Sequence, residues 1–380
     1  MRIAHLADLH LGYRAYNRIT SQGINLREAD VFNAFKQALA KIAEIQPDLI
    51  VIAGDLFHTV RPSNLCIQHT FRAFLDLRSK QRCDAPIVII GGNHDSPRSV
   101  DTGCILDLLA NVPGVHVVHH EYRGIKIPEI DTTIFCLCHR ALPELSQTKL
   151  EADPSSKYNI LALHGTVDGI SHTFSDIVMI NPPDILNDGW DYVACGHYHL
   201  HTKLADNAYY SGSTEYTSSN IWEEVEKPKG FIEYDLDAKS AVFHKLETRK
   251  VLPLRAIDAR DLTSNEINEL VEARIAGIEG GHEEKIIRLV FENLPRQVQG
   301  DLDYAFIRKI KSEALHFETQ FRAPKRESVT GSCDSVQNRP LEAEWCEFVG
   351  IASDLPGGVE RDKLVELGMR YLGQHQAVGE

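Results

Sequence analysis

The amino-acid sequence predicts an α/β fold that is followed by a small, separate α+β unit. Five short apolar runs, each of strand length, alternate with segments whose apolar residues recur at helical spacing. Every run is followed within a few residues by an Asp, Asn or His. Short apolar runs of this kind are typical of buried strands in a parallel sheet. Ligands of open α/β sheets bind just beyond the carboxyl ends of such strands, so the chemistry is expected at this edge.

The run in residues 49–53 is central to the pattern, because Gly54 breaks it and the carboxylate of Asp55 follows at once. The same arrangement recurs four times along the chain. Residues 3–7 precede Asp8 and His10, residues 87–90 precede Asn93, His94 and Asp95, residues 160–163 precede His164, and residues 192–195 precede His197 and His199. A fold that aligns the five strand ends brings these side chains into one cluster.

The segments between these runs complete a first domain, which we assign to residues 1–249. Apolar periodicity predicts helices at residues 30–45, 62–79 and 102–111, and further strands at residues 115–118, 133–138, 230–234 and 241–245. Residues 209–216, YYSGSTEY, are expected to form a strand and a turn rich in hydroxyl groups. The second and third helices carry more apolar surface than one sheet face needs. Core packing explains most such stripes, and a helix-to-helix dimer contact is the alternative.

The polar segment 12–29 is expected to be a loop at the mouth of the site. It interleaves aromatic and basic residues, namely Tyr13, Arg14, Tyr16 and Arg18. Such residues can stack on bases and pair with phosphates. An ordinary solvated loop explains them equally well.

Residues 250–326 differ in pattern and are assigned to the α+β unit. Strands are expected at residues 252–257, 285–294 and 315–322, a helix opened by the capping box of Thr263 and Glu266, and a second helix at residues 301–314. Several basic side chains of this unit can touch a phosphate backbone, although a solvated helix face explains the first three equally well: Arg308, Lys309, Lys311, Arg322, Lys325 and Arg326.

Residues 327–340 are polar and are predicted to be a linker. Residues 341–380 form a tail with two short amphipathic segments, the first of which carries Trp345 and Phe348. The tail is too short for a core of its own. It is therefore expected either to pack back on the catalytic domain or to dock on a partner.

Composition places the chain among soluble globular proteins, with 43% hydrophobic and 25% charged residues. No apolar run reaches membrane-spanning length, the first residues lack the pattern of a secretory signal, and no pair of cysteines has the spacing of a zinc site. We expect a cytoplasmic protein without disulfides. The net charge of −14 argues against unaided binding to nucleic acid, so tight DNA binding is expected to need a partner.

The clustered residues have the chemistry of a two-metal site. The first ion would be held by Asp8, His10, Asp55 and His199, and the second by Asp55, Asn93, His164 and His197. A carboxylate that reaches both ions holds them roughly 3.5–4 Å apart, as in two-metal hydrolases. Oxygen and imidazole donors without thiolate favour manganese, iron or zinc over a closed structural zinc site. Such a pair can bind a phosphate and activate a water for attack on it.

His94 is adjacent to a ligand and is spare, so it is the natural acid for the leaving oxygen. Asp95 either holds this imidazole by a hydrogen bond or caps the following turn, and the cap is slightly favoured. His58 and Arg61 can contact the phosphate. A single His after a strand is usually structural, whereas seven ligand-type residues at five strand ends argue for a metal site.

Taken together, these residues resemble the calcineurin-like metallophosphoesterase superfamily. The motifs are DxH (Asp8, His10), GD (Asp55), GNHD (residues 92–95), a lone His164, and GHxH (residues 196–199). The runs DLHLG and GDLFH look like the SbcD-type DNA repair nucleases within it. The likeness is strong over residues 1–249, covers residues 250–326 by size and order only, and is weak in the tail.

The resemblance implies a two-sheet sandwich with flanking helices, in which residues 250–326 form a capping domain that contacts DNA. It further implies a nuclease that uses two Mn²⁺ ions, with Mg²⁺, Fe²⁺ or Zn²⁺ as alternatives, and in which His94 is catalytic. The expected partners are DNA, an SMC-like ATPase of the SbcC type that docks on the tail, and a second copy of the chain. Tyr13, Arg14, Arg18 and Arg61 would contact the DNA.

Two other functions stay open at this point. One is a stand-alone phosphodiesterase for small nucleotides, although a small substrate needs no additional domain. The other is a scaffold that binds DNA ends and uses its metals structurally, against which the complete ligand set and His94 argue. The protein-phosphatase branch is disfavoured because GDLFH lacks the Asp-Arg-Gly that follows in GDxVDRG.

Overall fold

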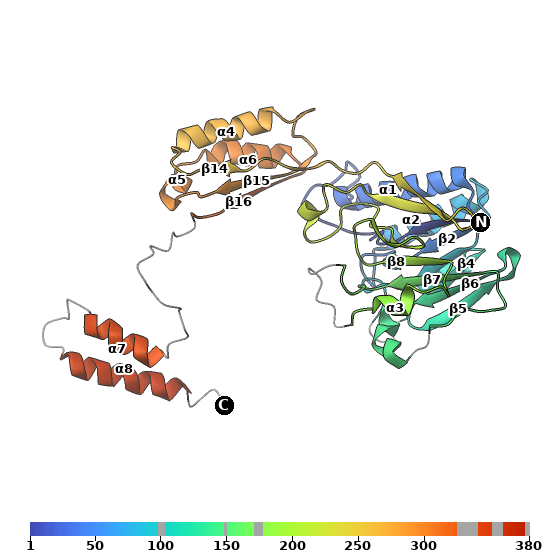
Figure 1. Ribbon diagram of the computed structural model, residues 1–380. Helices are drawn as coiled ribbons and strands as arrows, with labels where there is room; N and C mark the ends of the chain where they lie inside the picture. Colours follow the sequence, from blue (N-terminus) through green and yellow to red (C-terminus); the bar gives the residue numbers. More distant parts are fainter. Residues whose placement is uncertain (98–102, 148–149, 171–177, 325–340, 352–359, 377–380) are drawn as a thin grey trace. The chain divides into compact units, whose positions relative to one another are not determined.

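The computed structural model describes residues 1–97, 103–147, 150–170, 178–324, 341–351 and 360–376 (Figure 1). The chain divides into two compact units, Met1–Pro324 and Lys325–Glu380, which are described separately. None of the described helices is long and apolar enough to cross a membrane.

The first sheet of the larger unit has six strands in the order β12-β11-β1-β2-β3-β4. The four strands from β1 to β4 are parallel, and β11 and β12 extend the sheet in antiparallel pairing. Their bounds are β1 (Arg2–Leu6), β2 (Leu49–Ile52), β3 (Ile87–Ile90), β4 (Val115–Val118), β11 (Gly230–Asp235) and β12 (Ser240–Lys245). The central strands are buried on both faces, which explains their continuous apolar sequence.

The second sheet also has six strands, in the order β5-β6-β7-β8-β10-β9. The four inner strands, β6, β7, β8 and β10, are parallel to one another, and the edge strands β5 and β9 pair with them in antiparallel fashion. Their bounds are β5 (Tyr122–Ile127), β6 (Thr132–Leu137), β7 (Tyr158–His164), β8 (Tyr192–Gly196), β9 (Thr202–Ala205) and β10 (Ala208–Tyr210). The core that the two sheets share includes Val51 and Val88 from the first sheet and Ile160 and Ala194 from the second.

Helices cover the outer face of the first sheet. α1 (Leu26–Ile45) and α2 (Asn64–Ser79) pack Phe35 and Phe74 against each other in the core beneath them. The structure confirms the predicted α/β class, a two-sheet sandwich with flanking helices, to which a small α+β unit is added. The remaining short helices are η2 (Ile105–Asn111), η3 (Pro128–Ile130), η4 (His139–Gln147), α3 (Pro182–Ile185) and η5 (Ile221–Glu223).

Two helix predictions need correction. The first helix begins at Leu26 rather than Asp30, because the side chain of Asn25 accepts hydrogen bonds from the N–H groups of Arg27 and Glu28. The third is a 3-10 helix that spans Ile105–Asn111, and the predicted start at residue 102 lies outside the described residues.

The third sheet has the order β13-β15-β14, and β16 also pairs with β15. Its elements are β13 (Val251–Pro253), β14 (Ile257–Asp258), α4 (Ser264–Ala276), β15 (Ile286–Glu292), α5 (Arg296–Gly300), α6 (Tyr304–Glu313) and β16 (His316–Phe321). The capping box of Thr263 and Glu266 is confirmed. The strand predicted at residues 252–257 is instead two short strands, Val251–Pro253 and Ile257–Asp258.

Side chains of the loop before α1 contact the α+β unit. The ring of Tyr16 stacks on that of His316, with centroids 4.0 Å apart. The guanidinium of Arg18 donates to the carbonyl oxygens of Lys311, Ser312 and Ala314 at the end of α6. The domain boundaries at residues 249 and 326, and those of the linker and tail, stay predictions.

The smaller unit contains two helices, α7 (Leu341–Ile351) and α8 (Arg361–Gln376). They pack on each other, and the Trp345 Nε1–H donates to the carbonyl of Val365 at 3.3 Å. The side chain of Phe348 is 64% exposed. Leu367, Met369 and Tyr371 are exposed as well, so this hairpin presents apolar side chains to its surroundings.

Candidate metal centre

The strand ends place the predicted donors together. Side chains that follow three strands of the first sheet and two of the second lie within contact of one another. Four of the seven predicted ligands have left-handed backbone, with φ between 48° and 97°: Asp8, His10, Asp55 and His197. This conformation is costly for residues other than glycine and is concentrated at functional sites. The turns thus fix where the donor side chains lie.

The first group of donors contains Asp8, His10 and His199, and one ligand atom from each lies within 4.8 Å of the others. The Nε2 atoms of His10 and His199 are 3.0 Å apart. His10 Nε2 is also 3.8 Å from Asp55 Oδ2. These are the four residues predicted for the first ion.

The second group gathers around Asn93. Its Oδ1 lies 3.0 Å from His164 Nε2 and 3.0 Å from His197 Nδ1. His164 Nε2 is in turn 3.4 Å from Asp55 Oδ2. The same carboxylate oxygen of Asp55 is therefore close to one histidine of each group, the position expected of a ligand shared by two ions.

Backbone contacts orient the donors. Both carboxylate oxygens of Asp8 accept the N–H of His197 at 3.0 Å. Nδ1 of His164 lies 2.9 Å from the carbonyl oxygen of Ala53 and donates to it, which turns Nε2 toward Asn93 and Asp55. Gly92 is required because a Cβ there would collide with the carboxylate of Asp55.

The electrostatics of the cluster depend on burial and on one ion pair. Burial raises the pKa of Asp8 to about 7 and lowers that of His10 to about 3. Burial would also raise the pKa of Asp55, but the neighbouring His164 outweighs it and holds this pKa well below its usual range. Conversely, burial acts to lower the pKa of His164, and Asp55 raises it to about 9. A cation at this position would displace the His164 proton, since metal ligands must be deprotonated.

The donor set fits a pair of divalent cations. Carboxylate, amide and imidazole donors converge within hydrogen-bonding distance of one another, and the neutral imidazole of His10 faces that of His199. Oxygen and nitrogen donors of this kind suit manganese, iron or zinc. The grouping around two centres is the one that the sequence predicted, although the ligand roles themselves stay a proposal.

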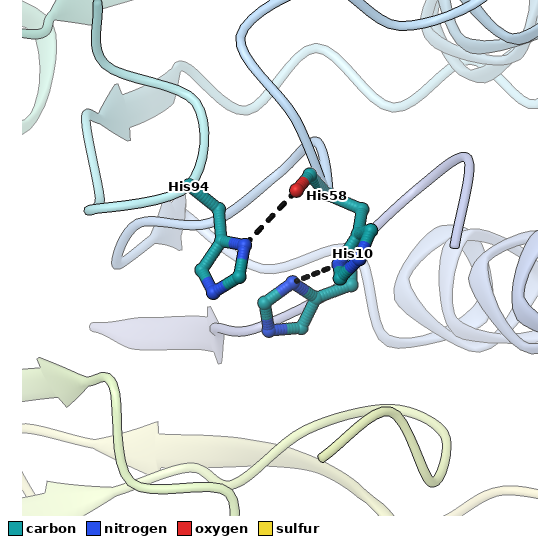
Figure 2. Close-up of side chains that lie close together, drawn as sticks. All are labelled: His10, His58 and His94. Atoms are coloured by element: carbon teal, nitrogen blue, oxygen red, sulfur yellow. Dashed lines mark hydrogen bonds between the residues drawn. The ribbon is translucent and has the colours of Figure 1, made fainter. Parts of the chain in front are cut away.

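His94 and His58 lie beside His10, which belongs to the first group of donors (Figure 2). Nδ1 of His94 is 2.9 Å from the carbonyl oxygen of His58, and His58 Nδ1 is 3.3 Å from His10 Nδ1. The backbone N–H of His94 donates to Asp55 Oδ1 at 2.8 Å. Nitrogens of His10, His58 and His94 come within 4.8 Å of one another, so distance alone does not separate acid from ligand.

Asp95 was a candidate catalytic residue that would either hold the His94 imidazole or cap the following turn. Its carboxylate accepts the N–H groups of Leu56, Phe57 and Gly92. This ties the loop after β2 to the loop after β3. These N–H groups precede Asp95 in the chain, so the contacts differ from a cap on the following turn, and we propose a positioning role for Asp95.

The four predicted DNA contacts have different surroundings. Tyr13 lines the cavity over the metal centre. Arg14 pairs with Glu28 at 2.7 Å, beside a second hollow that Arg61 also lines. Arg18 is turned to the α+β unit, as described above, so it belongs to that interface.

Sequence reasoning missed two features of the site. Lys229 is buried and donates to Glu224, to Ser213 Oγ and to the carbonyl of His199. A single Lys in a polar segment carries no signal of this role. His139 lies 6.1 Å from the His197 ring between centroids, and it was detectable, because it directly follows the apolar run of β6 as other site residues follow theirs.

A cavity of about 700 Å³ opens over the donors. Five of the seven predicted donors line it together with His94, namely His10, Asp55, Asn93, His197 and His199. Polar residues of the segment after β10 also line it: Thr217, Ser218, Ser219, Asn220, Glu223 and Glu224.

Comparison with known proteins gives one family. The model of the calcineurin-like phosphoesterases matches residues 1–201. The DNA double-strand break repair protein Mre11 of Methanococcus maripaludis is 28% identical over 72% of this chain and 73% of that protein. The SbcD subunit of the nuclease SbcCD of Staphylococcus epidermidis is 27% identical over 72% of this chain and 75% of that protein. A solved structure, the calcineurin-like phosphoesterase YfkN from Bacillus subtilis, aligns with a TM-score of 0.31 at 12% identity, over 65% of this chain and 90% of that chain.

Proposed function

Because the chain belongs to the calcineurin-like phosphoesterase family and is a hydrolase of phosphate esters, we propose that it is a two-metal nuclease that cleaves phosphodiester bonds in DNA. The observation that carries the proposal is the position of Asp55, whose Oδ2 lies near a histidine of each donor group. The names of relatives that match over most of the chain, a repair protein and a nuclease component, support DNA as the substrate.

The proposed division of labour follows the donor groups. Asp8, His10, Asp55 and His199 would hold one cation, and Asp55, Asn93, His164 and His197 the other. The cations would supply Lewis acidity, activating a water and neutralising charge on the phosphate. We propose manganese as the preferred ion, with magnesium, iron and zinc as alternatives.

His94 would give a proton to the leaving oxygen of the scissile bond. Its Nδ1–H donates to the carbonyl of His58, so Nε2 is the nitrogen that exchanges the catalytic proton. His58 would contact the phosphate, and Asp95 would hold the two loops in register. Tyr13, Arg14 and Arg61 are proposed to guide the strand.

The proposed assembly is a second copy of the chain together with an SMC-like ATPase. The exposed apolar side chains of the α7–α8 hairpin, Phe348 among them, support a docking role, because exposed apolar groups of this kind often mark protein contacts. The side chain of Trp345 contacts α8, so it would support the docking face from within the hairpin and would not itself insert into the partner. The repair role and cytoplasmic location stay part of the same proposal.

The test compares three substrates on the chelated and the metal-reloaded protein: linear duplex DNA, cyclic nucleotides and bis-p-nitrophenyl phosphate. We expect cleavage of the DNA and the chromogenic diester only after metal is added, with manganese best. Asp55→Ala should abolish cleavage and metal binding, and the exposed Asp84→Ala serves as its control. Full activity after exhaustive chelation would refute the metal mechanism. Preference for cyclic nucleotides over DNA would favour the small-nucleotide phosphodiesterase.

A further inference from the structure

The segment after β10 forms a wall of the active-site cavity that the proposed metal chemistry does not use. It is the hydroxyl-rich stretch that follows Tyr210. Thr217, Ser218, Ser219 and Asn220 line the same cavity as His94. Thr217 is only 5% exposed, and Ser218 is half-buried.

Two hydroxyl groups of this wall have no partner within the described part of the chain. They are Thr217 Oγ1 and Ser218 Oγ, both with almost no exposed surface. A buried polar group without a partner costs free energy, so native proteins nearly always supply one. A hydroxyl group both donates and accepts, which suits it to a neutral, polar ligand.

The charges beside the wall argue against a phosphate at this place. Glu223 and Glu224 line the same part of the cavity. The ammonium group of Lys229 is committed to Glu224, Ser213 and the carbonyl of His199. A further anion at this wall, in addition to a phosphate at the metal centre, would therefore meet the carboxylate of Glu223. A neutral group that carries its own donors and acceptors would not.

We propose that Thr217 and Ser218 form a nucleoside subsite, which binds the sugar or base next to the scissile phosphate. This rests on the proposed function, because the metal centre would hold the phosphate itself. A cavity of about 700 Å³ lies within the range of small-molecule sites and has room for more than the phosphate. The ring of Tyr198 lines the same cavity, and aromatic rings are common platforms for bases.

A nearby residue provides a matched control. Thr214 lies in the same segment, is fully buried and likewise has an Oγ1 without a partner in the described structure. It is not among the residues that line the cavity. Thr214→Val and Thr217→Val therefore delete the same group from the same segment, and only the second deletes it from the subsite.

The experiment uses two diesters with the same leaving group, thymidine 5′-(p-nitrophenyl phosphate) and bis-p-nitrophenyl phosphate. The measured quantity is the ratio of kcat/KM for the nucleoside ester to kcat/KM for the plain ester. Thr217→Val and Ser218→Ala should each lower this ratio about 2–10-fold, through KM of the nucleoside ester, the usual scale for one hydrogen bond. Thr214→Val should leave the ratio unchanged.

An unchanged ratio in both subsite variants would overturn the subsite, and so would an equal fall in the Thr214→Val control. If the wild-type protein cleaves neither diester, the nuclease proposal fails separately. Calorimetric binding of the thymidine ester then tests the subsite by itself. Thr217→Val must weaken that binding relative to Thr214→Val, and equal affinities would refute the subsite.

Discussion

At the scale of single residues, His94 is held through both its backbone N–H and its imidazole. Its N–H donates to Asp55, and its imidazole Nδ1 donates to the carbonyl of His58. These contacts orient the ring, although His94 belongs to neither of the two predicted sets of metal ligands that share Asp55. The proposed acid role of His94 therefore predicts that the ring can be removed while the predicted metal ligands stay in place.

His94→Ala should keep the metal content of the protein and lower the rate about 10²–10⁴-fold, the usual loss when a general acid is removed. Elemental analysis and steady-state kinetics on the same preparation measure both quantities. His120→Ala, at an exposed histidine outside the site, is the control. Loss of metal in His94→Ala would instead make this residue a ligand, in line with its closeness to His10 and His58.

His5 is a second residue whose surroundings predict a measurable effect. It lies on β1 and is fully buried, and its Nδ1 is 2.9 Å from the hydroxyl of Tyr192. Burial lowers the pKa of His5 to about 3, because a charged imidazole cannot be solvated there. In the unfolded chain this pKa returns to about 6.5. Below pH 6.5 the unfolded state therefore binds more protons than the native state.

The free energy of unfolding should consequently fall as the pH drops from 6.5 toward 3. The contribution of His5 is about 2 kcal/mol at pH 5. Urea unfolding at pH 5 and pH 7 measures it. The double variant His5→Phe with Tyr192→Phe should lose that part of the pH dependence, and Tyr192→Phe alone should keep it. An identical pH dependence in both variants would contradict the assignment.

At the scale of elements, a buried ion pair between Lys229, which precedes β11, and Glu224, which follows η5, contacts the loop after β8. The ammonium of Lys229 lies 2.5 Å from Glu224 Oε2 and 2.9 Å from the carbonyl of His199. Oε1 of Glu224 is 3.7 Å from His199 Nδ1. Burial lowers the pKa of Lys229, and Glu224 opposes this effect. The pair thereby contacts both the backbone and the ring of one predicted ligand.

Lys229→Met should cost about 3–5 kcal/mol of unfolding free energy, because it leaves Glu224 buried without its cation. The double variant Lys229→Met with Glu224→Met should recover most of that loss. Denaturant unfolding measures the free energies, and calorimetric titration with Mn²⁺ measures affinity at the centre. If the single variant is no less stable than the double, the ion pair does not stabilise this loop.

The elements also show which parts of the fold can be predicted from sequence. The central strands were predicted because burial on both faces leaves a continuous apolar run, as in Ile87–Ile90. The edge strand β5, Tyr122–Ile127, was missed because its exposed positions carry Arg123, Gly124 and Lys126. The donors of the site were predicted because each follows a recognisable strand. The contacts of Lys229 could not be predicted, since its partners lie 5, 16 and 30 residues away along the chain.

At the scale of the whole molecule, the two units carry separate parts of the proposed function. All the predicted metal donors lie in Met1–Pro324, and the exposed apolar hairpin of α7 and α8 lies in Lys325–Glu380. Residues 325–340 include the whole predicted linker, residues 327–340, and lie outside the described residues. The division predicts that catalysis and partner binding can be separated.

A chain that ends at Pro324 should retain manganese-dependent cleavage of short single strands. It should lose ATP-stimulated work on duplex ends, for which an SMC-like ATPase must deliver the strand. Phe348→Ser, at an exposed apolar side chain of α7, should weaken ATPase capture in a pull-down without changing basal cleavage. A lower melting temperature of the truncated chain together with intact capture of the ATPase would show self-packing instead.

The donors come from both six-stranded sheets, and this has a consequence for the lifetime of the protein. Cations that bind only the folded sandwich add stability, about 2.7 kcal/mol when their concentration is 100 times Kd. In a cell short of metal, the chain would therefore populate unfolded forms more often and be degraded faster. Metal starvation would lower not only the activity of each molecule but also the number of molecules, so abundance itself would report the metal supply.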